Sequence, residues 1–79
     1  MTAKAFILIE TAVGKSREVV DVVGRLPGVK SVDAVTGPYD IIAVVEGENL
    51  GDIGELITGK IHPVNGIQRT VTCLAIKTV

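Results

Sequence analysis

A continuous apolar run and a helical spacing of apolar residues follow each other near the start of the chain, and each predicts one kind of element. The stretch AKAFILIE, residues 3–10, predicts a strand that is apolar on both faces. The stretch KSREVVDVVGRL, residues 15–26, predicts a helix, with Ser16 or Gly14 at its start and Pro27 beyond its end. The apolar stripe of this helix consists of Val19, Val22, Val23 and Leu26.

Two stretches of β-branched residues follow and predict a pair of neighbouring strands. The first is VKSVDAV, residues 29–35, and the second is YDIIAVVE, residues 39–46. The segment IIAVV is too continuously apolar to have a solvent-exposed face. The two strands are joined through TGPYD, in which Gly37 and Pro38 are typical of a hairpin turn that runs to Asp40.

The rest of the chain predicts a second helix and a last strand. Asn49 is placed to cap the helix, and Gly59 is placed to end it. The apolar side of this helix is formed by Leu50, Ile53, Leu56 and Ile57. The stretch IHPVNG predicts a loop because of its Pro and its Asn-Gly pair, and residues 67–77 predict a long final strand.

The order of these elements, β-α-β-β-α-β, is that of the ferredoxin-like α+β fold. In this fold a four-stranded antiparallel sheet carries both helices on one face. The other face would expose apolar residues of the strands, and a patch of that size is unusual on a monomer. Because a second copy packed sheet to sheet would cover it, we predict a homodimer whose two sheets face each other.

Length and composition limit the classes of function. With 79 residues the chain has room for a single domain, residues 1–79, and a domain this small often depends on disulfides, metals or self-association. Cys73 is the single cysteine and His62 the single histidine, so we expect no disulfide, no metal site and no cofactor. We interpret Cys73 as a small core residue and His62 as a loop residue.

Charge and hydropathy limit the partners. A net charge of −1 gives no general attraction for nucleic acid, and only Phe6 and Tyr39 could stack on bases. The longest apolar run is too short to span a bilayer, and Lys4 alone is a thin basic region for a secretory signal. We expect a cytoplasmic protein that contacts neither nucleic acid nor membrane directly.

The TGPYD segment also contains Tyr39 and Asp40, which a hairpin alone does not require. Thr70 and Thr72 lie two residues apart on the last predicted strand and therefore point the same way. Asp40 could bind the ammonium group of a zwitterion while hydroxyls or N–H groups bind its carboxylate. Alternatively, Asp40 caps its own turn and the threonines are ordinary strand residues, and spacing alone favours this second interpretation.

With these features the chain resembles the effector-binding domain of the Lrp/AsnC family, the feast/famine regulators, also called the RAM domain. Three stretches carry the resemblance, which covers essentially the whole sequence: LPGV, VTGPYDIIAVVE and GIQRTVTCLAIK. It implies a dimeric α/β barrel, frequently assembled into rings of dimers such as octamers, that binds an amino acid or a related effector between dimers. By position, Gly37, Tyr39 and Asp40 match the family's hairpin loop, and Thr70 and Thr72 match its last strand.

Family regulators normally carry an N-terminal helix-turn-helix domain, whereas the first predicted strand here begins within a few residues of Met1. The chain thus resembles the stand-alone form of the domain. The leading hypothesis is a small-molecule sensor that binds an amino acid at a subunit boundary and acts through assembly or through a full-length Lrp/AsnC regulator.

Two alternatives remain open, a structural assembly module without a ligand and a small enzyme of the dimeric α/β-barrel type. The enzyme hypothesis lacks an evident nucleophile and base, so we expect no catalytic residues. Copper chaperones and ACT domains share the frame, but the former need paired cysteines and the latter do not usually show the TGPYD hairpin.

Overall fold

The strands of the protein form one antiparallel sheet. The computed structural model describes residues 2–76. The strands are β1 (Ala3–Thr11), β2 (Val29–Ala34), β3 (Ile41–Gly47) and β4 (Ile67–Leu74). They lie in the order β2-β3-β1-β4, so the first strand of the chain is central and β2 and β4 are the edges. Every neighbouring pair is antiparallel.

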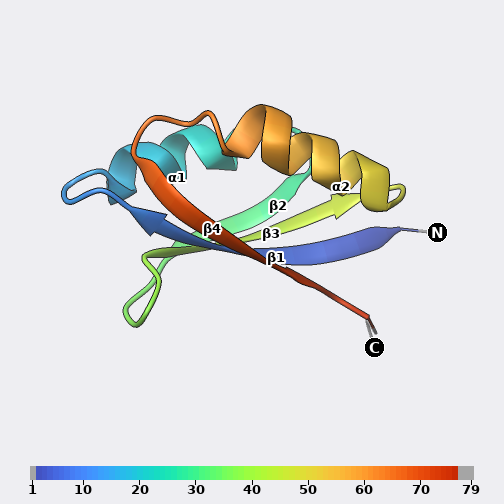
Figure 1. The fold of residues 1–79 in the computed structure, drawn as a ribbon, viewed down its shortest axis with the longest axis horizontal. Coiled ribbons are helices and arrows are strands. Elements are labelled where there is room, and N and C mark those ends of the chain that lie inside the picture. The colour runs from blue at the N-terminus through green and yellow to red at the C-terminus, as the bar shows by residue number, and fades with distance from the viewer. Residues whose placement is uncertain (1, 77–79) are drawn as a thin grey trace.

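The helices all cover the same face of the sheet (Figure 1). They are α1 (Ser16–Gly24), α2 (Leu50–Leu56) and the short π-helix η1 (Ile57–Ile61), which continues directly from α2. The predicted ferredoxin-like arrangement is therefore confirmed, with one addition, the π-helix.

The core lies between the sheet and the helices. Strands β1 and β3 direct alternate residues into it, and these are fully buried because the helices cover them. The buried strand residues are Ala5, Ile7, Ile9, Ile41, Ala43 and Val45. The buried helix residues are Val19, Val23, Ile53, Ile57 and Ile61. This core is entirely apolar, since no polar side chain among the described residues is classed as buried.

The opposite side of the sheet, which we call the open face, is also apolar. Phe6 is paired with Val44 on one side and with Cys73 on the other, and Leu8 is paired with Ile42 and Val71, so all six side chains share this face. No helix of the described chain covers it (Figure 1). Phe6 remains 36% exposed. Strand β1 is thus apolar on both faces, as predicted.

The first helix is shorter and presents a narrower apolar stripe than predicted. It ends at Gly24, and the N–H of Leu26 donates to the carbonyl of Val23 over 3.1 Å in a tight turn beyond that end. Val22 was expected on the stripe but is 44% exposed. The reason is geometric: Val19 and Val23, one turn apart, already occupy the line of contact with the sheet.

The start of the second helix agrees with the sequence in its cap and differs in its first apolar residue. Oδ1 of Asn49 accepts from the N–H of Asp52 over 3.0 Å, and Oδ2 of Asp52 accepts from the N–H of Glu48 over 3.2 Å. The two bonds together fix the first turn, with Asp52 bonding the residue before the cap and not the cap itself as in a capping box. Leu50, expected on the apolar side, is instead 59% exposed.

The predicted end of the second helix at Gly59 is wrong. The helical path continues through Gly59 as η1, whose wide turn ends in a bond of 2.8 Å from the N–H of His62 to the carbonyl of Ile57. This path keeps both Ile57 and Ile61 in the core. His62, expected in a loop, therefore caps the π-helix.

The remaining differences concern the strands. Strand β3 begins at Ile41 and not at Tyr39, and β4 ends at Leu74. The predicted end of β4 at Lys77 lies outside the described residues. The interpretation of Cys73 as a core residue is wrong, because strand alternation places it on the open face, where it is exposed.

Candidate functional site

The TGPYD hairpin and the loop between β1 and α1 lie at the same end of the sheet (Figure 1). This follows from the antiparallel pairing of β1 with β3, because the end of one strand lies beside the start of the other. The hairpin is closed by a bond of 2.9 Å from the N–H of Val35 to the carbonyl of Asp40. Gly37 adopts a φ of 140°, a conformation that L side chains rarely accept.

The carboxylate of Asp40 is held by Thr11, the last residue of β1, and not by its own hairpin. Its Oδ2 atom accepts from the backbone N–H of Thr11 over 2.8 Å and from the Thr11 hydroxyl over 3.4 Å. The interpretation that Asp40 caps its own turn is therefore wrong. The predicted turn from Gly37 to Asp40 also closes differently, because the N–H of Asp40 donates across the sheet to the carbonyl of Ile9 over 2.9 Å.

A short chain of hydroxyl groups extends from Asp40 to the first helix. Oγ1 of Thr11 lies 2.8 Å from Oγ of Ser16, the first residue of α1. Since the Thr11 hydroxyl donates to Asp40, it is the Ser16 hydroxyl that donates to Thr11. The carboxylate thus sits at one end of a directed series of hydrogen bonds that fixes its position relative to α1.

Thr70 and Thr72 point to the helix-covered side of the sheet, in the same direction, as predicted. They are paired with Ile9 and Ile7, whose side chains are buried on that side. Oγ1 of Thr70 lies 3.0 Å from Nε2 of His62 at the end of η1. His62 is therefore a polar residue of this edge of the sheet.

The structure does not bring the five sequence-predicted site residues together within one chain. Strand β1 lies between β3, which begins after Asp40, and β4, which carries both threonines. No hydrogen bond between described residues joins Asp40 to Thr70 or Thr72. Tyr39 is half-buried beside Asp40, while Gly37 is exposed with open space around it. Within one chain, β1 therefore separates Asp40 from both threonines.

Sequence reasoning missed Thr11, Ser16 and His62. A signal for Thr11 was available. In the predicted fold the first strand pairs antiparallel with the strand that follows TGPYD, so the end of the first strand lies beside Asp40. His62 could not be placed by pattern, since its contact with Thr70 depends on η1, which extends past Gly59.

A candidate metal centre and a membrane-spanning helix are both absent from the described residues. Between residues 2 and 76, no group of three or more His, Cys, Asp or Glu side chains is placed to hold a metal ion. Over the same residues, no helix has the length and apolar character needed to cross a membrane.

Comparison with known proteins places the chain in a family. The sequence model of the Lrp/AsnC ligand binding domain matches residues 4–79. The chain belongs to the Lrp/AsnC family. Among curated relatives of this Lrp/AsnC domain, an uncharacterized HTH-type transcriptional regulator of Pyrococcus horikoshii, PH1916, is 35% identical over 63 residues. That match covers 80% of this chain and 42% of the regulator, so the chain corresponds to less than half of the relative.

Solved structures share the fold of this chain. The hypothetical protein PHS023 of Pyrococcus horikoshii is 44% identical with a TM-score of 0.89, and the match covers 99% of this chain and 93% of that one. The transcriptional regulator NMB0573 of Neisseria meningitidis, solved as a complex with L-Met, shares the fold with a TM-score of 0.86 at 20% identity. That match covers 98% of this chain and 51% of the regulator.

One enzyme also contains a related segment. Homocitrate synthase of Sulfurisphaera tokodaii is 36% identical over 52 residues, which are 66% of this chain but 11% of the enzyme. The match is thus confined to a small part of that protein.

Proposed function

We propose that this Lrp/AsnC domain is a cytoplasmic amino-acid sensor that binds its effector at the boundary between subunits of a homo-oligomer. Effector binding would change assembly or contact with a full-length regulator of the same family. A ligand acts in this way only to the extent that it binds one assembly state more tightly than another.

The observation that carries the proposal is the placement of the Asp40 carboxylate. Oδ2 is engaged by Thr11, which fixes the rotamer, while a carboxylate has acceptor capacity on both oxygens. Asp40 closes the hairpin that contains the positive-φ Gly37, at one end of the sheet. A preoriented carboxylate of this kind suits the ammonium group of an amino acid.

The second half of the proposed site would come from another copy. Thr70 and Thr72 share one direction on the edge strand β4, and Thr70 is paired with His62. Their hydroxyl groups and the imidazole could donate to the effector's carboxylate. Because β1 separates them from Asp40 within one chain, we propose that Asp40 of one subunit and the threonines of a neighbour enclose the ligand.

The relatives support an amino acid as the ligand class. The matched family model describes a ligand binding domain. The Neisseria regulator with the same fold was solved as a complex with L-Met. At 20% identity the pocket residues of that protein do not transfer, so the side-chain preference of this chain is left to experiment.

We further propose that the homodimer forms through the open face. The six paired side chains around Phe6 and Leu8 make a continuous apolar surface on the side of the sheet without helices. A second sheet packed against it would remove this surface from water and complete an α/β barrel.

A structural assembly module without a ligand is the second candidate, and the Asp40–Thr11 hydrogen bond also suits it. In that case the carboxylate would serve only to join its hairpin to the end of β1. The two candidates differ in what Asp40→Asn does, because the amide keeps an acceptor for Thr11 but loses the negative charge that an ammonium group needs.

The test is the melting temperature of the protein against each of the twenty amino acids. A ligand present at about 100 times its dissociation constant stabilises the folded state by roughly 2.7 kcal/mol, enough to raise the melting temperature measurably. We expect a shift with one or a few amino acids that is lost in Asp40→Asn and retained in Asp21→Asn, an exposed aspartate on α1. No shift with any amino acid would instead support the assembly module.

A further inference from the structure

The carboxylate of Asp40 uses one of its two oxygens inside the chain. Oδ2 accepts from both the N–H and the hydroxyl of Thr11, over 2.8 and 3.4 Å. Between residues 2 and 76, no group donates a hydrogen bond to Oδ1, and no Lys or Arg side chain forms an ion pair with it. An ionised carboxylate can accept on both oxygens, so Oδ1 keeps its capacity for a partner from outside the chain.

The N–H of Thr11 can bond a side chain because of where the strands end. The pairing of β1 with β3 stops at Ile9 and Ile41, so Thr11 lies two residues beyond the last paired position. On the other side of β1, the register with β4 shifts between Glu10 and Thr11. A shift of this kind disrupts the ladder locally and re-aims side chains, as in a β-bulge. Both features turn Thr11 away from ordinary strand pairing.

The end of β1 is held in place from two further directions. The N–H of Ala12 donates to the carbonyl of Gly66 over 2.8 Å, which ties the residue after Thr11 to the turn before β4. The Ser16 hydroxyl donates to the Thr11 hydroxyl over 2.8 Å. Thr11 and Ser16 are both half-buried, so water competes less for these bonds than it would on an open surface.

We infer that Thr11 and Ser16 are positioning residues of the effector site and that they assign the two oxygens of Asp40. Oδ2 is bound by the protein, and Oδ1 faces the ammonium group of the effector. Ser16 acts through Thr11, because its hydroxyl bonds to that of Thr11 and not to the carboxylate. The inference rests on the proposed function for the identity of the ligand.

The same arrangement selects a charged carboxylate at this position. Both groups that Thr11 directs at Oδ2 are donors. An amide in place of the carboxylate would therefore present its oxygen to Thr11 and its NH₂ group to the effector. That NH₂ group would face the ammonium group with the wrong polarity. Asp40→Asn is thus expected to keep the fold and to lose the effector.

The first part of the test needs no ligand. Carbon-detected NMR of the full chain measures the resonance of the Asp40 side-chain carboxyl, which responds to hydrogen bonds at that group. We expect the resonance to move in Thr11→Val and in Ser16→Ala, because each removes a hydroxyl from the series. Thr11→Ser keeps the hydroxyl and should return the resonance toward its wild-type position.

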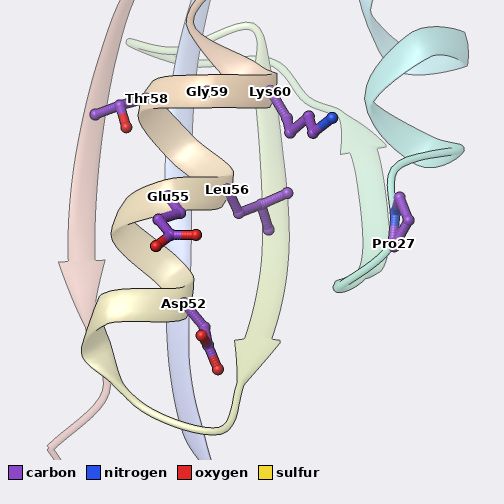
Figure 2. Close-up of a pocket in the computed structure, with 7 residues that line it drawn as sticks. All are labelled: Pro27, Asp52, Glu55, Leu56, Thr58, Gly59 and Lys60. Carbon is purple, nitrogen blue, oxygen red and sulfur yellow. The ribbon is translucent and has the colours of Figure 1, made fainter.

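Thr58→Val is the matched control. Thr58 lies on η1, where it lines a groove on the helix layer (Figure 2). Its hydroxyl donates to the carbonyl of Gly54 over 2.8 Å, so the variant also removes a bonded hydroxyl, but one outside the series that ends at Asp40. We expect the carboxyl resonance to be unchanged in this variant.

The second part is calorimetric titration with L-Met, or with the amino acid that gives the largest shift in the melting-temperature panel. Thr11→Val should weaken the affinity about threefold to tenfold, the range expected for one hydrogen bond. Thr11→Ser should recover most of that loss. Ser16→Ala should weaken the affinity less, and the double variant should bind no more weakly than Thr11→Val alone, because Ser16 acts through Thr11. Thr58→Val should bind as wild type does.

Each outcome has a separate meaning. A wild type that binds no amino acid overturns the sensor and the role of Oδ1, while the carboxyl resonance still decides whether Thr11 and Ser16 position the carboxylate. Unchanged affinity in Thr11→Val overturns the positioning role and leaves the sensor in place. A loss that Thr11→Ser does not recover, with circular dichroism showing a folded chain, also overturns it. Additive losses in the double variant would remove Ser16 from the series.

Discussion

The backbone N–H of Thr11 donates to Oδ2 of Asp40 over 2.8 Å, joining two residues that are 29 positions apart in the chain. The bond links the end of β1 to the entry of β3, and the Thr11 hydroxyl continues the link to Ser16 at the start of α1. The position of the TGPYD carboxylate is therefore set by the end of β1 and not by the hairpin that carries it.

Replacing Asp40 with Ala should lower the free energy of unfolding by about 1–3 kcal/mol, because the N–H of Thr11 loses its acceptor in a half-buried position. Asp40→Asn should cost less, since the amide oxygen can take over. Urea unfolding followed by circular dichroism measures both, with Asp21→Asn as the matched control. Equal stability of Asp40→Ala and wild type would show that the bond contributes nothing in solution.

Replacing Asn49 with Ala should destabilise the protein by about 1 kcal/mol, because the N–H of Asp52 loses its capping oxygen. Asn49→Asp should retain most of the stability, since its carboxylate can cap in the same way. Asn65→Ala, in the exposed turn before β4, is the control and should change stability little. The cap would be refuted as a source of stability by similar unfolding midpoints for the two alanine variants.

Two glycines with positive φ should respond differently to alanine. Gly14, with a φ of 79°, has open space at the position of a side chain, so Gly14→Ala should cost only the backbone strain of about 1–2 kcal/mol. At Gly66, with a φ of 101°, a Cβ atom would lie 2.9 Å from Cβ of Lys15. Gly66→Ala should therefore be the more destabilising change in thermal unfolding. The reverse order would contradict the packing of the turn before β4 against α1.

The glutamate variant of Phe6 should prevent the sheet-packed dimer without unfolding the chain, because Phe6 is already 36% exposed in one copy. Burying an unpaired carboxylate between two sheets is strongly unfavourable. Light scattering should report a monomer, and circular dichroism should remain as in wild type. Val13→Glu changes a fully exposed valine in the loop after β1 and serves as the control. A Phe6→Glu variant that still dimerises would exclude the open face as the interface.

The order of elements and the cap at Asn49 could be predicted from the sequence because both depend on local patterns. The alternation of strand residues and the spacing of Val19 and Val23 follow directly from backbone geometry. Leu50 and Val22 were wrongly placed on the apolar stripes of their helices. An apolar residue at the margin of a stripe fits the helical spacing as well as one at its centre, and only packing decides which side chains reach the sheet.

The end of the second helix could not be predicted because a local rule competes with burial. Gly59 is a typical helix end, yet Ile61 is drawn into the core and the chain widens its turn to reach it. The position of His62 next to Thr70 follows from that detail. Similarly, Thr11 is far from Asp40 in the sequence, and the two residues are brought together only by the order of the strands in the sheet.

The central claim is that Asp40 binds the ammonium group of an amino acid, and calorimetric titration tests it most directly. L-Met, or the amino acid with the largest shift in the melting-temperature panel, would be compared with its analogue that lacks the amino group, in wild type and in Asp40→Asn. The account predicts that removing the amino group and removing the charge of Asp40 each abolish binding, and that the two effects do not add. Equal affinity of wild type for the two compounds, or undiminished binding by Asp40→Asn, would contradict it.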